Sequence, residues 1–310
     1  MDNTGNFGYD IIGDVHGHID ELEILLERLD YQYIESVWQH PTRKAIFTGD
    51  FICRGLNSKP VIALIRDMVN HNFAQAILGN HELNAILYFT KSKEKSIHEP
   101  SKSTLSLLLR FAAEYGRQTD FLANDIHWLR TLPLYLDYGS FRVVHAYWNH
   151  EHIKILSQLH EEGKIKKKRL KEIADRKGQY SRAISETTRG IEFLLPNDLL
   201  LKDSNFISRN SFRLKWWLPM KGHTFKEMCF GNRFELPHYT IPDQIIKPYA
   251  VYSADEPIVF IGHYCMGEQL IQTPNICCVD ACIASNGSLA AYRYDGESVL
   301  IAEKLVLVKK

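Results

Sequence analysis

Polar side chains suited to binding metal ions follow several short apolar runs in this chain of 310 residues. Their carboxylate and amide oxygens suit hard divalent cations, and their imidazole nitrogens suit borderline ones. The set consists of Asp14, His16, Asp50, Asn80, Glu82, His145 and His263. Mixed ligands of this kind on one rim are what two adjacent metal ions require, with one carboxylate bridging them. The residue types therefore predict a site for a pair of divalent metal ions.

The spacing of these residues supports the prediction, because each residue taken singly has a simpler explanation. An Asp that follows Gly at the end of a strand is more often a turn or cap residue. Asp14 and Asp50 are 36 residues apart, however, and Asp50 and Asn80 are 30 apart. Each interval matches one strand–helix–strand step, which puts the three side chains at equivalent positions.

A regular order of elements in the first eighty residues would bring these side chains together. Apolar runs at 9–12, 45–47 and 76–78 predict strands, and helical stripes at 19–29 and 61–69 predict the helices between them. This order is typical of a parallel sheet with right-handed crossovers. The carboxyl ends of its strands share one edge, where ligands bind.

The rest of the chain supplies further expected elements. Residues 83–137 have a mostly helical pattern, and 151–182 form a charged helical stretch whose basic run at 164–171 is interpreted as a solvated face. Apolar strands at 141–144 and 257–261 lead into two histidine motifs. More strands are expected at 276–279, 289–294 and 299–308.

Composition is that of an ordinary globular protein, with 45% hydrophobic and 24% charged residues. The 37 basic and 37 acidic residues balance, which disfavours nucleic acid as a partner, apart from nucleotide substrates. No apolar stretch approaches the ~18 residues of a membrane span, and residues 1–10 lack the pattern of a signal peptide. We therefore expect a cytoplasmic protein with no membrane partner.

The six cysteines are too few and too clustered to indicate a disulfide framework. We expect them to be reduced, partly buried thiols. Cys277, Cys278 and Cys282 lack the paired spacing of a structural zinc site, so we reject that interpretation.

Three segments resemble the ordered motifs of the phosphoprotein-phosphatase type of metallophosphoesterase, which is calcineurin-like. They are 13–17 (GDVHG), 49–55 (GDFICRG) and 79–82 (GNHE). Segments 144–146 (VHA) and 262–264 (GHY) are similar to the two later histidine motifs. The chain most resembles two bacterial groups: symmetrical diadenosine tetraphosphate hydrolases, and protein-phosphatase-like enzymes related to the phosphatase module of a polynucleotide kinase-phosphatase. Segments 213–217, 275–280 and 287–293 are similar to the second group.

The resemblance implies an α/β fold, namely a metallophosphoesterase β-sandwich of two mixed sheets flanked by helices. Because it touches both ends of the chain, it also implies a single catalytic domain over residues 1–310. This domain would carry a helical insertion at about 84–137 and a lid-like insertion at about 150–255.

The resemblance also implies two divalent metal ions, manganese first, with iron, zinc, nickel or magnesium as alternatives. The first ion would be held by Asp14, His16 and Asp50. Asp50 would bridge to the second ion, which is completed by Asn80, His145 and His263.

The chemical roles implied by the resemblance fall on two other side chains. Arg54 would bind phosphate oxygens, which its planar guanidinium suits. His81 would protonate the leaving oxygen as general acid, and a metal-bridging hydroxide would attack. Apart from the resemblance, Arg209 and Arg213 lie in the expected lid and are candidates for a phosphate contact, although solvated or ion-paired arginines fit the sequence equally well.

Several residues have competing interpretations. Glu82 is better explained by hydrogen bonds to a loop backbone than by metal binding. His223, in the segment KGHT, competes with His263, but an apolar strand leads only into His263. The histidines expected to be peripheral are His18, His150 and His152.

One position departs from the family pattern. An Asp usually precedes the motif arginine and orients the general-acid histidine, whereas this chain has Cys53. A neutral thiol cannot pair with imidazolium as a carboxylate does, so we expect a less basic and less well oriented His81.

The function predicted is that of a binuclear metal-dependent phosphatase that acts on phosphomonoesters, either phosphoprotein Ser/Thr or small phosphorylated molecules. Hydrolysis of a dinucleoside polyphosphate such as diadenosine tetraphosphate is the alternative. A non-catalytic phosphate-binding or regulatory relative is the second alternative, suggested by Cys53.

Overall fold

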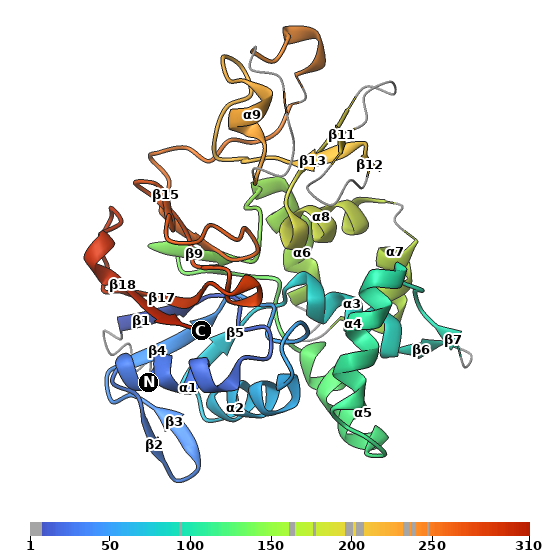
Figure 1. Ribbon diagram of the computed structural model, residues 1–310, viewed down its shortest axis with the longest axis vertical. Coiled ribbons are helices and arrows are strands. Elements are labelled where there is room, and N and C mark those ends of the chain that lie inside the picture. Colours follow the sequence, from blue (N-terminus) through green and yellow to red (C-terminus); the bar gives the residue numbers. More distant parts are fainter. Residues whose placement is uncertain are drawn as a thin grey trace.

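The computed structural model describes residues 8–92, 95–160, 165–175, 178–195, 201–202, 208–231, 236, 240–246 and 248–310. Two five-stranded sheets form its centre, and helices flank them (Figure 1). This arrangement confirms the predicted α/β sandwich of two mixed sheets.

The first sheet contains the strands predicted near the amino terminus. Its order is β18 (Leu305–Lys309), β17 (Ser288–Tyr294), β1 (Gly8–Ile12), β4 (Arg43–Phe47) and β5 (Ala74–Ala76). Strands β1, β4 and β5 are parallel, as predicted, whereas β17 and β18 run antiparallel to their neighbours. Two crossover helices, α1 (Ile19–Arg28) and α2 (Ser58–Asn70), connect the parallel strands.

The second sheet carries the two later histidine motifs at its strand ends. Its order is β15 (Ile271–Thr273), β16 (Ile276–Cys278), β14 (Ile258–Ile261), β9 (Phe141–Val144) and β8 (Tyr135–Asp137). The three central strands are parallel, and the two edge strands are antiparallel to them.

Alternation along the strands decides which residues join the sheets. Ile11 and Ile46 point into a buried cluster that also contains Phe260 of the second sheet, so this cluster is the centre of the sandwich. Their neighbours Ile12 and Phe47 point the other way, into the core under α1 and α2. Both faces of the first sheet are therefore covered, which places its functional residues at the strand ends.

The segments predicted to be helical form two groups of helices. The first group is α3 (Asn80–Phe89), α4 (Lys102–Ala113) and α5 (Thr119–Leu129), and the second is α6 (His150–His160), α7 (Lys167–Ala174) and α8 (Gln179–Arg189). The predicted basic run lies mainly on α7, and its first residue, Lys164, is outside the described residues. Two short hairpins, β2 (Gln32–Ile34) with β3 (Val37–Gln39) and β6 (Lys91–Ser92) with β7 (Lys95–Ser96), extend from this framework.

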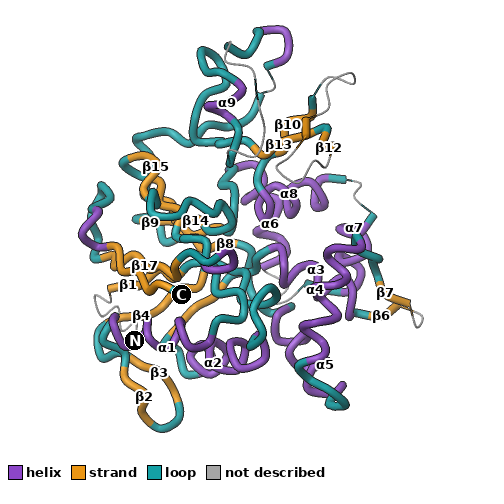
Figure 2. The backbone as a smooth tube through the Cα atoms, in the orientation of Figure 1, coloured by secondary structure: helices purple, strands orange, loops and turns teal. Residues whose placement is uncertain are grey.

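The later part of the predicted lid-like insertion, after α8, builds a small unit above α6 and α8 (Figure 2). Its elements are β10 (Glu192–Leu194), β11 (Leu201–Lys202), β12 (Ser208–Arg209), β13 (Ser211–Arg213) and α9 (Phe225–Met228). A separate buried cluster that includes Phe193, Phe212 and Phe225 holds it together. Strand β10 pairs with β13, which places Arg213 opposite Glu192.

Some element boundaries differ from the prediction. The expected strand at 299–308 begins only at Leu305, because Ala302–Lys304 form a 3₁₀ turn before it. The third apolar run forms a strand at Ala74–Ala76, not at 76–78, because Leu78 leaves the sheet and donates its N–H to the carbonyl of Pro133. None of the helices in the described part of the chain has the length and apolar character needed to cross a membrane.

Candidate metal centre

The loops after β1 and β4 carry the first two predicted carboxylates. Asp14 and Asp50 are each only 2% exposed. Gly49 has a φ of +100°, and a Cβ on it would lie 2.5 Å from the backbone nitrogen of Gly79. Glycine is needed here because only a residue without a side chain allows the β4 loop and the start of α3 to approach so closely.

Asp14 also joins the edges of the two sheets. Its carboxylate oxygens each accept the backbone N–H of His263 at 3.2 Å. The loop after β1 therefore touches the loop after β14, although the two residues are far apart in the sequence. This contact brings the histidines of the second sheet to the carboxylates of the first.

Asp50 is the carboxylate shared by two clusters of possible metal ligands. One cluster contains Asp50, His16 and His81, and the other contains Asp50, His145 and His263, with ligand atoms within 4.8 Å of one another in each. Oδ2 of Asp50 lies 3.8 Å from Nε2 of His16 and 3.9 Å from Nε2 of His81. Oδ1 lies 3.4 Å from Nε2 of His145. The two carboxylate oxygens thus face different groups of imidazoles.

Two buried polar atoms at this place have no hydrogen-bond partner among the described residues. They are Oδ1 of Asn80 and Nε2 of His145. The other ring nitrogen of His145 lies 2.7 Å from the carbonyl oxygen of Thr48, which holds the ring with Nε2 toward Asp50. A bound cation would satisfy both atoms, because each offers a lone pair in a polar, buried place.

The charges of the two carboxylates are strongly coupled to their surroundings. Burial and the nearby charges of Asp280 and Asp50 raise the pKa of Asp14 well above its usual range. Burial by itself would raise the pKa of Asp50 too, but attraction to His145 and His81 holds it well below its usual range. Asp50 is thus the carboxylate that stays ionised most readily.

Burial keeps two of the imidazoles neutral. It lowers the pKa of His16 to about 3 and holds that of His263 well below its usual range. Nδ1 of His16 lies 3.1 Å from the carbonyl oxygen of Ile52, and Nε2 of His263 lies 3.1 Å from that of Arg189. If these nitrogens donate, the other nitrogen of each ring is left as a lone pair for a cation.

Glu82 has the structural role that the sequence favoured. Its carboxylate accepts backbone N–H groups from both loops of the centre: Oε2 from Asp50 at 2.8 Å and Gly79 at 3.0 Å, and Oε1 from Phe51 at 2.9 Å and Ile52 at 3.2 Å. That interpretation is confirmed.

A cavity of about 370 Å³ opens onto these residues. Its lining includes the predicted side chains Asp14, His16, Asp50, Arg54, Asn80, His81, Arg213 and His263. His145 lies behind them, fully buried. The side chain of Arg209 is outside the described residues, so the structure leaves that interpretation untested.

The competing histidines lie elsewhere. His223 precedes α9 in the insertion and is absent from the described lining of the cavity. His150 lies 2.8 Å from Glu256, and His152 lies 3.5 Å from Glu186. The structure thus places His263, not His223, beside Asp50.

Cys53 does not face the cavity. Its side chain is 2% exposed in the core under α2, and its Sγ lies 3.9 Å from the carbonyl oxygen of Leu107 on α4. The thiol thus points away from the place where the family's carboxylate would act on His81.

The sequence did not single out two acidic residues that line the cavity. Asp280 follows β16 at the same sheet edge as the predicted carboxylates and histidines, and burial raises its pKa to about 6. Its position after an apolar strand was the available signal. Glu192 comes from β10 in the insertion, where the pattern carried no signal.

The prediction that all cysteines are reduced is wrong for one pair. Cys265 and Cys282 form a disulfide, and both line the cavity. Their loops follow β14 and β16, and these strands are parallel neighbours, so their ends lie side by side. The other four cysteines are free and buried, as predicted.

Comparison with known proteins identifies the family. The model of the calcineurin-like phosphoesterase family matches residues 9–271. The chain belongs to this family. The predicted resemblance is therefore confirmed. As a member of this family, the protein is a metal-dependent phosphoric ester hydrolase.

Two curated relatives are both named bis(5'-nucleosyl)-tetraphosphatases. The phosphoesterase is 34% identical over 144 residues to a bis(5'-nucleosyl)-tetraphosphatase PrpE (asymmetrical) of Oceanobacillus iheyensis, a match that covers 44% of this chain and 54% of the relative. The chain thus spans about half of that relative's length. It is 23% identical over 306 residues to a symmetrical bis(5'-nucleosyl)-tetraphosphatase of Actinobacillus pleuropneumoniae, covering 95% of this chain and 98% of the relative.

A solved structure shares the fold. The cold-active protein-tyrosine phosphatase of a psychrophilic Shewanella species superposes with a TM-score of 0.50 at 15% identity, over 98% of this chain and 80% of the other. At this identity the likeness supports the metallophosphoesterase fold and nothing about substrate.

Proposed function

We propose that this phosphoesterase hydrolyses a phosphoric ester or anhydride bond in the cavity above Asp50, with two divalent metal ions. The observation that carries the proposal is the position of Asp50, whose two oxygens face two separate clusters of imidazoles. Sharing one carboxylate between two sites is the arrangement that a two-metal centre needs.

We assign the ligands by the distances and by the unpaired atoms. The first ion would be held by Asp14, His16 and Asp50, and the second by Asp50, Asn80, His145 and His263. Oxygen and imidazole donors together fit manganese, which we propose as the first metal to test. When bound, the ions supply positive charge at the phosphoryl oxygens and lower the pKa of water to about 7.

Two side chains of the lining complete the proposed chemistry. Arg54 on the loop after β4 is exposed toward the cavity, where it would bind phosphoryl oxygens with two parallel N–H groups. His81 on α3 would give its proton to the leaving oxygen. Its ring stands edge-on to that of His16, with centroids 4.9 Å apart, and it lines the cavity.

We place dinucleoside polyphosphates first among the substrates, ahead of the phosphomonoesters that the sequence favoured. Both relatives named above are bis(5'-nucleosyl)-tetraphosphatases, and one of them matches nearly the whole chain. Phosphomonoesters are the second candidate, because segments 213–217 and 275–280, which are similar to protein-phosphatase-like enzymes, supply Arg213 and Asp280 to the cavity. Initial rates on diadenosine tetraphosphate and on a phosphopeptide, both with manganese, would separate the two.

Replacement of the shared carboxylate tests the proposal. Asp50→Asn should abolish nearly all hydrolysis and lower the metal content measured by mass spectrometry, since it weakens both sites at once. Asp67→Asn, an exposed position on α2, is the matched control and should change neither. Two tightly bound ions that persist in Asp50→Asn would contradict the assignment.

A further inference from the structure

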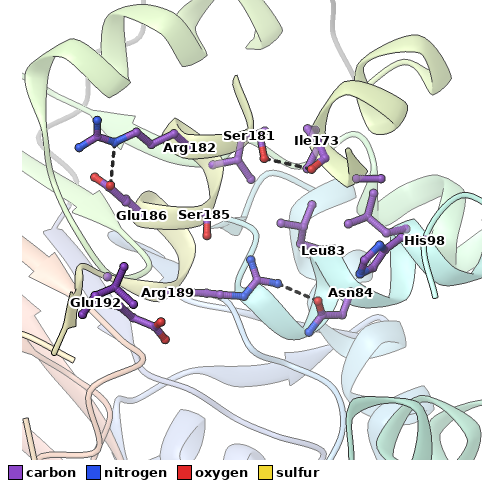
Figure 3. Close-up of a pocket in the computed structure, with 15 residues that line it drawn as sticks. Leu83, Asn84, His98, Ile173, Ser181, Arg182, Ser185, Glu186, Arg189 and Glu192 are labelled. Atoms are coloured by element: carbon purple, nitrogen blue, oxygen red, sulfur yellow. Dashed lines mark hydrogen bonds and ion pairs between the residues drawn. The ribbon is translucent and has the colours of Figure 1, made fainter. Parts of the chain in front are cut away.

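A second cavity lies beside the metal centre, among α3, α7 and α8 (Figure 3). Its volume is about 520 Å³. This volume is within the range of ordinary small-molecule sites, which is about 300–1,000 Å³. No residue assigned to metal binding lines it, so it is not part of the metal centre itself.

The second cavity is directly adjacent to the first. Glu192 lines both of them. Arg189 connects them through its two ends, because its carbonyl oxygen lies 3.1 Å from Nε2 of His263 and its guanidinium donates to Oδ1 of Asn84 at 2.7 Å. Asn84 is one turn beyond Asn80 on α3. A group bound in the second cavity therefore lies next to a phosphoryl group held in the first.

The lining suits an uncharged group. Its two arginines, Arg182 and Arg189, are balanced by Glu186 and Glu192, and Arg182 is already paired with Glu186 at 2.9 Å. A cavity without net charge does not select further phosphates, which gather where positive charge is in excess. Apolar walls complete it; they come from Leu83, Leu87, Ile173, Ile184 and Leu194.

The order of these features, from the first cavity into the second, matches the parts of a nucleotide. A nucleotide presents a phosphate, then a ribose with two hydroxyl donors, then a flat and largely apolar base. Arg54 lines the phosphoryl cavity, Glu192 lies at the junction, and Leu83 and Leu87 line only the second cavity. Carboxylates bind ribose hydroxyls in other nucleotide sites. A phosphopeptide offers no hydroxyl pair for Glu192 to bind.

We propose that the second cavity binds the nucleoside attached to the phosphoryl group that is cleaved, with Glu192 accepting hydrogen bonds from its ribose. This inference rests on the proposed function and adds to it the part of the substrate that is not transferred. It makes α8 a determinant of substrate choice.

The test fills the cavity without disturbing the metal centre. Ser185 is an exposed residue of α8 that lines the cavity, so Ser185→Trp adds bulk there and leaves the core intact. Gln179→Trp, exposed on the same helix but outside the cavity lining, is the control. We expect Ser185→Trp to raise KM for diadenosine tetraphosphate about tenfold or more. Its KM and kcat for 4-nitrophenyl phosphate should stay at the values of Gln179→Trp.

Binding provides a readout that does not depend on turnover. Adenosine 5'-monophosphate should bind the manganese-loaded protein more tightly than inorganic phosphate in calorimetry, and Ser185→Trp should remove the difference. Equal affinity of the two ligands for the unmodified protein would overturn the nucleoside site, as would an unchanged KM for the dinucleotide in Ser185→Trp. A protein that binds the nucleotide at α8 and yet hydrolyses no substrate would support the cavity and contradict the proposed function instead.

Discussion

Glu82 fixes the turn that presents Asp50. Oε2 of Glu82 accepts the backbone N–H of Asp50 at 2.8 Å, and Oε1 accepts those of Phe51 and Ile52. Asp50 has a φ of 53°, a conformation that non-glycine residues adopt rarely. A fully buried carboxylate on α3 thus accepts the hydrogen bonds of the loop N–H groups that water would otherwise accept. It thereby holds Asp50 in its unusual conformation.

The first prediction follows from that contact. Glu82→Gln places an NH₂ donor against backbone N–H donors, so at least one buried group loses its partner. We expect the free energy of unfolding to fall by about 1–3 kcal/mol and the metal content to fall with it. Chemical denaturation and metal analysis are the measurements, with Glu23→Gln, exposed on α1, as the control. Unchanged stability in Glu82→Gln would show that the four hydrogen bonds do not hold the loop.

A second prediction concerns His81, which belongs by distance to the same cluster as His16 and Asp50. If His81 is the proton donor, His81→Ala should retain both metal ions. It should slow alkyl phosphates by about 10²–10⁴-fold and slow 4-nitrophenyl phosphate less, because a good leaving group needs little protonation. Loss of one metal ion with equal slowing of both substrates would make His81 a ligand and not the acid.

The alternation of strands and helices explains why so much of the centre was predictable. Each parallel strand of the first sheet ends at the same edge, so local apolar runs were enough to bring Asp14, Asp50 and Asn80 together. The same logic applied to the second sheet located His145 and His263. The residue types also limited the number of candidates, because only Asp, Asn and His residues that directly follow a strand had to be considered.

Features that depend on contacts between distant segments were not predictable. Glu192 reaches the cavity because β10 pairs with β13, and the part of the insertion that follows α8 carries no regular apolar pattern. The disulfide forms because β14 and β16 are neighbours, which the order of strands along the chain does not reveal. The last strand starts only at Leu305, whose partner on β17 is Tyr292. Before it, the N–H of Ile301 donates to the side-chain hydroxyl of Tyr292 and not to the backbone of β17.

A third prediction concerns stability against pH. His152 on α6 is buried against α8, and burial is the main reason that its pKa is lowered, although the charge of Glu186 opposes this effect. Below pH 6.5, the ordinary pKa of histidine, the unfolded chain therefore binds more protons than the folded one at this position. The free energy of unfolding must then fall as the pH drops below 6.5, because stability follows the difference in bound protons.

This effect can be separated from that of the other buried histidines by a difference measurement. His152→Gln should show a smaller loss of stability between about pH 7 and pH 5 than the unmodified protein. His71→Gln, an exposed position after α2, should keep the original slope. Equal slopes in His152→Gln and the unmodified protein would mean that His152 titrates alike in both states.

The last prediction concerns Cys53, where the structure changes the expectation drawn from the family. An Asp that oriented His81 would have to lie at the cavity, but the Cys53 side chain lies in the core and faces the carbonyl of Leu107. Burial raises the pKa of this thiol, and the nearby charges of Glu82 and Asp50 raise it further. A carboxylate in the same place would be buried, close to two negative charges and next to a carbonyl oxygen. It would therefore be held in its neutral form or would destabilise the fold.

We therefore expect Cys53→Asp to lower the free energy of unfolding, and to lower it more at pH 8 than at pH 5, where the added carboxyl is protonated. Cys53→Ser, whose hydroxyl can donate to the same carbonyl, should be closer to the unmodified protein. The backbone does not explain the difference, since Asp tolerates the φ of 69° found here as well as Cys does. A stable Cys53→Asp whose alkaline limb of activity shifts upward for alkyl phosphates would contradict this expectation. It would show that position 53 reaches His81 in the working enzyme.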